Sequence, residues 1–238
     1  MQEFLVYDQL SDCPYLEGQT ARMPLRRPIG MSAAEFDERL AAGDRRMGRY
    51  LYRTQCPRCQ ACEAIRVPVA EFVAVRTHKR TVRQGDELLT LQIGLPQCDE
   101  IRVALYNQHK LGRGLARDDE PMDADGYYQF LVDSCANTLE FSYWDGPRLV
   151  AVGISDRGAK SLNAVYCYFD PSFQALSLGT YNVLKQIEIC RTWQVDYLYL
   201  GLYIAASPHM NYKSRFLPHE RLVDGRWRRF ERGSLEPA

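Results

Sequence analysis

Residues 140–204 decide the fold and read EFSYWDGPRLVAVGISDRGAKSLNAVYCYFDPSFQALSLGTYNVLKQIEICRTWQVDYLYLGLYI. Short stretches rich in aromatic and β-branched side chains flank Asp145-Gly146, which is typical of strands joined by a tight turn. Further on, apolar side chains recur every three or four residues, which predicts an amphipathic helix. The expected order is three strands, a helix and a strand, over residues 140–144, 148–155, 162–169, 178–193 and 197–204.

The residues before position 75 predict smaller elements. Ser32 and Glu35 have the spacing of a capping box, so a helix is expected to start there. A strand is expected over residues 47–53. Residues 65–72 are expected to pair with it, and Pro68 favours a place at the edge of the sheet.

These elements, with further helices over 101–110 and 127–135, predict an α+β fold. We expect a small cysteine-containing N-terminal subdomain, residues 1–75, and a larger domain, residues 76–238. The order of elements in the larger domain is that of the GNAT acyltransferases. This is an analogy of fold, and it does not name a substrate.

The charge is balanced over the whole chain but not along it. The 238 residues include 30 basic and 30 acidic side chains, yet residues 22–83 hold 14 Lys or Arg against six Asp or Glu. A locally basic segment suits a phosphate backbone, and a solvated face balanced by distant acids is the alternative. No apolar run is long enough for a membrane span and no signal peptide is expected. The eight cysteines are therefore expected to be reduced thiols in the cytoplasm.

Residues 210–222, MNYKSRFLPHERL, are the strongest candidate for a functional segment. So many hydrogen-bonding groups cannot all be satisfied in a core, and a plain loop rarely combines them with aromatic residues. Tyr212 or Glu220 is a candidate to move a proton or orient an amine, and Lys213 to bind a phosphate or an oxyanion. Phe216 is expected either to pack in the core or to stack on a base.

The start of the helix predicted over 178–193 is a second candidate. Ser177 is a good N-cap, Gly179 allows close approach to the backbone, and Thr180 offers a hydroxyl. The free N–H groups of a helix start suit a phosphate. However, no Lys or Arg lies between Asp170 and Lys185, so a pyrophosphate cradle for coenzyme A is poorly specified. An ordinary capped helix is the alternative.

Two further segments carry chemistry. Cys56, Cys59 and Cys62 lie within seven residues, and Cys13 would complete a four-thiolate set for zinc or an iron–sulfur cluster. The alternative is that these thiols pack or line a pocket without metal. In residues 76–83, cations alternate with hydroxyls, which suits a phosphate backbone or the carboxylate of an acidic N-terminal residue. Arg76 and Arg80 are the candidates there, and an exposed charged turn is the alternative.

Several segments, in this order and spacing, resemble the aminoacyl-tRNA–protein transferases, and above all the short bacterial members that transfer leucine. They are Cys13-Pro-Tyr-Leu, Met47-Gly-Arg-Tyr-Leu-Tyr-Arg, Tyr168-Phe-Asp-Pro, Ser177-Leu-Gly-Thr-Tyr, Tyr197-Leu-Tyr-Leu-Gly-Leu-Tyr-Ile and Met210-Asn-Tyr-Lys. The resemblance implies that an amino acid esterified to a tRNA is moved onto the α-amine of a protein beginning with Asp or Glu, which marks that protein for degradation. No cofactor is required for the transfer, and no membrane partner is expected.

On this basis the aminoacyl-tRNA is expected to contact Tyr168, Ser177, Gly179, Thr180 and Phe216. Leucine is the favoured donor, for which the pocket should be apolar, whereas arginine would want a carboxylate. Arginyl transfer, a coenzyme A-dependent N-acetyltransferase and a non-catalytic zinc module that binds RNA are the alternatives.

Overall fold

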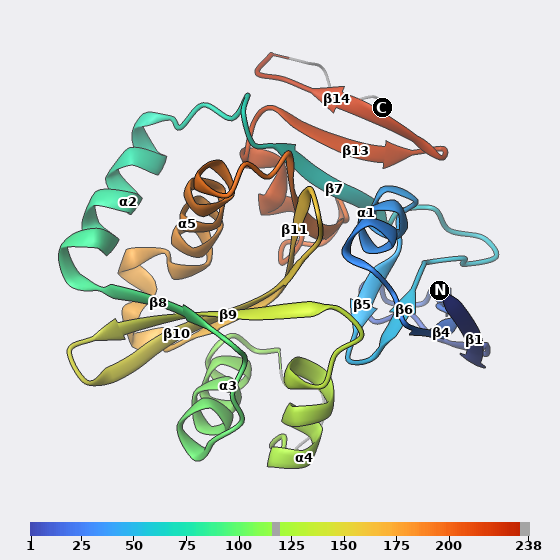
Figure 1. Cartoon of the computed structure of the whole chain (residues 1–238), viewed down its shortest axis with the longest axis horizontal. Coiled ribbons are helices and arrows are strands. Elements are labelled where there is room, and N and C mark those ends of the chain that lie inside the picture. The colour runs from blue at the N-terminus through green and yellow to red at the C-terminus, as the bar shows by residue number, and fades with distance from the viewer. Residues whose placement is uncertain (116–119, 234–238) are drawn as a thin grey trace.

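The computed structural model describes residues 1–115 and 120–233, and its centre is an eight-stranded sheet (Figure 1). In spatial order the strands are β14 (Arg226–Phe230), β13 (His219–Val223), β7 (Glu63–Pro68), β12 (Tyr197–Tyr203), β11 (Ser161–Phe169), β10 (Arg148–Arg157), β9 (Asn137–Asp145) and β8 (Thr90–Gly94). Neighbours are antiparallel except for β11 and β12, which run parallel. The crossover between these two strands is helix α5 (Leu178–Thr192). The strand and helix order predicted from residues 140–204 is confirmed.

Helices cover both faces of this sheet (Figure 1). Helices α2 (Arg76–Leu88) and α5 pack over one face, and α3 (Glu100–Gly112) and α4 (Ala124–Tyr127) over the other. Gly85 lets α2 approach α5 closely, because a Cβ at this position would lie 2.3 Å from the ring of Tyr181. In the part of the chain that the structure describes, none of the helices is both long and apolar enough to cross a bilayer.

The helix predictions outside α5 had mixed outcomes. The helix expected over 101–110 is confirmed as α3. The helix expected over 127–135 ends earlier, because α4 passes into a π-helical turn, Tyr128–Val132. Residues 76–83 are not a turn but the first part of α2. The sequence did not indicate this helix by an apolar pattern, because its buried residues are His78 and Gly85.

The N-terminal part forms a second, four-stranded sheet beside a short helix. Its strands are, in spatial order, β1 (Gln2–Tyr7), β4 (Leu25–Ile29), β6 (Tyr50–Tyr52) and β5 (Arg45–Met47). Between β1 and β4 in the chain, β2 (Leu10–Asp12) and β3 (Thr20–Arg22) form a separate two-stranded sheet. Helix α1 (Ala33–Ala41) begins with the predicted capping box, since the Ser32 and Glu35 side chains each bond the other's backbone N–H. Trp227 of β14 donates a hydrogen bond to the Ala41 carbonyl at 2.9 Å, which joins this part to the large sheet.

Two predictions about strands were wrong. Residues 47–53 do not form one strand, because the chain turns at Gly48, with φ of 56°, and divides into β5 and β6. Residues 65–72 do not pair with that segment at an edge, because β7 lies inside the large sheet between β13 and β12. Pro68 is the last residue of β7, so its missing N–H leaves the interior of the strand intact.

Candidate active site

A cavity of about 630 Å³ lies where strands β11 and β12 move apart. Strands β11 and β12 pair over only three residues each, Ser161–Asn163 with Tyr197–Tyr199. Beyond these pairs, Ala164 to Cys167 of β11 and Leu200 to Leu202 of β12 line the cavity. A parallel pair that opens in this way leaves room for a substrate between its carboxyl ends.

The N-terminal part supplies the opposite wall. It contributes mainly aromatic and apolar side chains, namely Tyr7, Pro14, Tyr15, Met23, Leu25, Met47 and Tyr52. Three cations also line the cavity, Arg45, Arg46 and Lys213. Among the described residues, no Asp or Glu belongs to the lining. The cavity therefore combines apolar walls with a positive charge.

Lys213 lies in the short 3₁₀ helix η3 (Asn211–Arg215) and lines the cavity. Its Nζ donates a hydrogen bond to the Leu202 carbonyl at 2.7 Å. Burial, and secondarily the charge of Arg45, lowers the pKa of Lys213 to about 7. A lysine with this pKa is present partly as a free amine at neutral pH, so it can accept a proton.

Tyr212 precedes Lys213 and also lines the cavity. Burial raises the pKa of its hydroxyl to about 12. The phenol therefore stays protonated at neutral pH and can donate a hydrogen bond. The two neighbouring residues offer a proton acceptor and a hydrogen-bond donor to the same space.

The start of α5 reaches the same cavity through Gly179. Ser177 is the N-cap residue of α5, as predicted, but it is exposed, adopts the left-handed conformation with φ of 52°, and makes no capping bond with its side chain. The preceding 3₁₀ helix, Pro171–Leu176, runs directly into this residue and sets its conformation. Thr180 is half-buried and is not part of the lining. Gly179 at the start of α5 and Lys213 nevertheless line the same cavity.

Three predicted site residues lie elsewhere. Tyr168 is fully buried, and its hydroxyl lies 2.5 Å from that of Tyr127 on the α3–α4 side of the sheet. Phe216 packs in the core and stacks on His78 at 5.5 Å between ring centroids. The carboxylate of Glu220 accepts a hydrogen bond from Arg66 at 2.6 Å, and Glu220 does not line the cavity. None of the three is placed to touch a substrate in the large cavity.

The four cysteines of the predicted metal site are neighbours. Burial, followed by the charges of Cys13, Cys56 and Cys59, raises the pKa of Cys62 to about 12. The backbone N–H groups that follow Cys13 donate to its Sγ at 3.5 and 3.4 Å. Within residues 1–115 and 120–233, however, no three or more potential ligands are arranged so that they could hold an ion.

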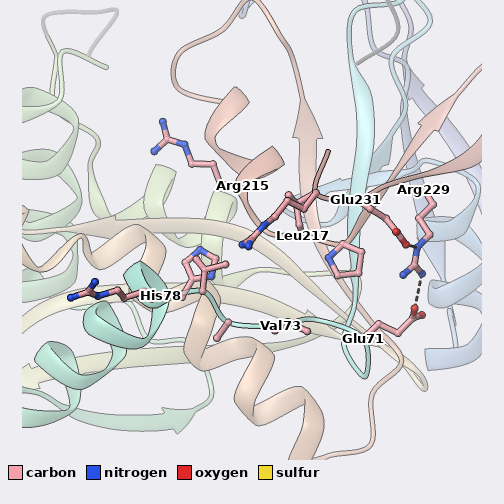
Figure 2. A pocket seen from close by; sticks show the side chains of 12 residues that line it. Glu71, Val73, His78, Arg215, Leu217, Arg229 and Glu231 are labelled. Carbon is pink, nitrogen blue, oxygen red and sulfur yellow. Dashed lines mark hydrogen bonds and ion pairs between the residues drawn. The ribbon is translucent and has the colours of Figure 1, made fainter. Parts of the chain in front are cut away.

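A second, basic cavity of about 540 Å³ lies at the start of α2 (Figure 2). In this view Arg215 and Leu217 lie above His78 and Val73. Arg76, Arg229 and Arg232 also line it, together with Glu71 and Glu231. Arg80 is exposed one turn further along α2 and is not part of the lining. The two cavities share η3, which gives Lys213 to one and Arg215 to the other.

Arg45 and Arg46 are the cavity residues that sequence reasoning missed. They lie within the basic segment 22–83, but nothing in its pattern separates them from the twelve other cations there. The only signal was their place directly before the predicted strand over 47–53, which could have suggested that one of them faces inward. Their burial, at 3% and 4% exposed, comes from the β5–β6 hairpin.

Known proteins resemble this chain over nearly its whole length. The family model described as the C terminus of arginine-tRNA-protein transferase matches residues 101–223, and the model for its N terminus matches residues 11–80. Aspartate/glutamate leucyltransferase of Acinetobacter baumannii is 37% identical over 227 residues, which cover 95% of this chain and 83% of that protein. The protein of the same name from Polynucleobacter necessarius is 35% identical and is covered to 92%.

Among solved structures, the chain is similar to the C-terminal DUF2156 domain of a protein named as a lysylphosphatidylglycerol synthetase, from Agrobacterium fabrum. The TM-score is 0.52 at 11% identity, over 72% of this chain and 59% of that one, so the likeness concerns the fold alone. The family models and the relatives together cover nearly the whole chain. The chain therefore belongs to the arginine-tRNA-protein transferase family and is an aminoacyltransferase.

Proposed function

We propose that the protein transfers leucine from Leu-tRNA to the α-amine of proteins that begin with Asp or Glu. The support is the lining of the large cavity, which is mostly apolar and, in the described part of the chain, contains no carboxylate. Such walls suit a leucine side chain, whereas a buried arginine side chain would lack a counter-charge there. The names of relatives that are 35–37% identical point to the same reaction.

The transfer needs no nucleotide, because the ester of the aminoacyl-tRNA is already activated. The acceptor amine attacks the ester carbonyl carbon, a C–N bond forms and the ester C–O bond breaks. The proton lost by the amine passes to Lys213, whose pKa is about 7, and then to the departing ribose hydroxyl. Tyr212, which stays protonated, donates a hydrogen bond to the oxyanion that develops on the carbonyl.

Glu220 has no part in this scheme, because its carboxylate is bound by Arg66 away from the cavity. Of the three residues at the start of α5 that the sequence assigned to the aminoacyl-tRNA, Ser177, Gly179 and Thr180, Gly179 lines the cavity and the other two do not. Its backbone faces the site with the positive end of the helix dipole, which favours the oxyanion or the last phosphate.

The basic cavity is the place we assign to the tRNA backbone. Arg76 and Arg215 are exposed there and have no ion pair among the described residues, so they are free to meet phosphates. Because η3 borders both cavities, a tRNA whose phosphates contact Arg215 can extend its 3′ end toward Lys213. Phosphate contacts of this kind position the RNA without reading its sequence.

The order β9, β10, β11, α5, β12 and the opening between β11 and β12 support a GNAT-like domain over 76–238, beside a cysteine-containing subdomain over 1–75. A structural zinc ion or iron–sulfur cluster at Cys13, Cys56, Cys59 and Cys62 stays a prediction, supported by their proximity and by the N–H groups that face Cys13. Metal analysis of protein purified anaerobically under reducing conditions tests it, and protein free of both metals would remove it.

The experiment mixes the protein with labelled Leu-tRNA or Arg-tRNA and with peptides that begin with Asp, Glu or Ala. Label from Leu-tRNA on the Asp and Glu peptides, and not on the Ala peptide, is the expected result. Label from Arg-tRNA alone would establish arginyl transfer instead. Acetylation of a peptide by acetyl-coenzyme A without tRNA would replace the proposal by the acetyltransferase alternative.

A further inference from the structure

Arg45 is a buried cation without a carboxylate partner. It is 3% exposed, and its Nη1 donates to the carbonyl of Asp44 at 2.6 Å. The carboxylate of Asp44 is occupied by other arginines, namely Arg26 at 2.6 Å, Arg53 at 3.0 Å and Arg39 at 3.3 Å. Among the described residues, Nε and Nη2 of Arg45 have no hydrogen-bond partner.

The neighbouring arginine shows the contrast. Arg46 also lines the cavity and is buried, but its Nε donates to Asp156 at 2.7 Å, and both side chains are closed to solvent. The Arg46 charge is therefore neutralised within the protein, and that of Arg45 is not. A guanidinium removed from water without a counter-ion is strongly unfavourable, so its persistence calls for an anionic ligand.

The free atoms of Arg45 have the geometry for one kind of anion. Nε and Nη2 form one edge of the guanidinium plane, and their N–H groups point in parallel toward the two oxygens of a carboxylate. The other Arg45 nitrogen, Nη1, is already used by the Asp44 carbonyl. The side chain is thus fixed at one end, and the other edge of its guanidinium is buried and has no hydrogen-bond partner among the described residues.

The position of Arg45 indicates which carboxylate this is. Arg45 lines the same cavity as Lys213, and its charge acts on the Lys213 amine, so the two groups lie near each other. In an N-terminal Asp, only the α- and β-carbons separate the reacting amine from the side-chain carboxyl group, and Glu adds one methylene. An amine placed at Lys213 therefore carries its own carboxylate toward Arg45.

We propose that Arg45 recognises the side-chain carboxylate of the first residue of the acceptor protein, and so makes the enzyme specific for Asp and Glu. The inference rests on the proposed function and adds the residue that selects the acceptor. A phosphate of the tRNA is the competing ligand. It is the less suited one, because a ribose separates the ester from the nearest phosphate, and the exposed arginines of the basic cavity are open to the backbone.

The test compares two acceptor peptides that differ only in Asp or Asn at the first position. The kcat/KM of leucyl transfer is measured for both, at saturating Leu-tRNA, in the wild type and in the Arg45→Met and Arg45→Lys variants. For the Asp peptide we expect Arg45→Met to lower kcat/KM about 10- to 100-fold, and the Asp-over-Asn preference to fall toward one. Arg45→Lys keeps the positive charge but loses the bidentate guanidinium edge, so it should retain part of the Asp-over-Asn preference. It also provides the measurement if Arg45→Met does not fold.

Arg53→Met is the matched control, because Arg53 shares the Asp44 carboxylate but lines neither cavity. It should leave the Asp-over-Asn preference unchanged. An unaltered preference in both Arg45 variants overturns the proposal. A raised KM for Leu-tRNA with an unaltered preference also overturns it and assigns Arg45 to a phosphate.

Calorimetric binding of the two peptides without tRNA separates this inference from the proposed function. A wild type that prefers the Asp peptide in binding, with loss of that preference in Arg45→Met, supports the role of Arg45 even if the donor is not leucine. Absence of leucyl transfer in the wild type would contradict the donor assignment alone. Equal binding of both peptides by the wild type would refute the role of Arg45.

Discussion

Replacing Lys213 by Met is the most direct test of the proposed proton transfer. With a pKa of about 7, half of the Lys213 side chains are free amines at pH 7, whereas an ordinary lysine would provide about one in 2,500. Between pH 6 and pH 8 the free-amine share of Lys213 rises about tenfold. Because Lys213 must be neutral to accept a proton, kcat/KM carries this factor in the wild type and not in the variant.

The assay follows initial rates of leucyl transfer to an Asp peptide at pH 6, 7 and 8. The peptide amine, with an ordinary pKa of about 7.7–8, titrates equally in both proteins. The ratio of kcat/KM at pH 8 to that at pH 6 should therefore be about ten times larger for the wild type than for Lys213→Met. At pH 8 the variant should be about 100- to 10,000-fold slower, as expected for loss of a general base.

Lys160→Met is the control, because Lys160 is exposed and lines neither cavity. It should keep both the rate and the pH ratio of the wild type. An equal pH ratio in the wild type and in Lys213→Met would refute the assignment of Lys213 as proton acceptor, even if the variant is slow.

The same ionisation acts on stability. The folded protein releases the Lys213 proton near pH 7, whereas the unfolded chain holds it until its ordinary pKa near about 10.4. Unfolding therefore takes up a proton between these values, and the wild type should gain stability relative to Lys213→Met as the pH rises from 7 to 10. Urea unfolding at several pH values measures this, and parallel curves for the two proteins would contradict the lowered pKa.

Three further predictions concern other parts of the molecule. Gly85→Ala should lower the free energy of unfolding, measured by urea titration, by about 1–3 kcal/mol, because the new Cβ would lie 2.3 Å from the Tyr181 ring. Gly94→Ala is the control and should change this free energy little, because the space around Gly94 is open. Arg215→Ala should raise the KM for Leu-tRNA and reduce the slope of log affinity against log salt by about one, without changing the peptide KM. Tyr212→Phe should lower kcat about 100-fold with unchanged KM values, and an unchanged kcat would exclude its hydroxyl from the oxyanion contact.

The central fold was predictable where local and global preferences agree. Residues 140–204 contain alternating strands, a tight turn and one helix with a regular apolar face, and each formed as expected. The failures come from positions whose conformation is set by distant contacts. Gly48 turns the chain where a continuous strand was expected, and a Cβ there would lie 2.4 Å from the Gln129 carbonyl. Sequence neighbours alone do not reveal that close approach.

The candidate site was predictable in part for a similar reason. Lys213, Tyr212 and Gly179 lie in segments whose composition is unusual, and all three line the cavity. Tyr168 does not, because its side chain packs against Tyr106 and Tyr127 on the α3–α4 side of the sheet. Arg45 was missed because its lack of a partner is a property of the assembled structure.

The cavity walls come from the first fifty-two residues, from the central strands and from residues beyond position 200. During synthesis on the ribosome, the cavity therefore stays incomplete until residue 213 has emerged. A product terminated before Met210 has the aromatic wall and both buried arginines but no Lys213. In the proposed mechanism such a product cannot carry out the proton transfer, because its cavity lacks the Lys213 amine.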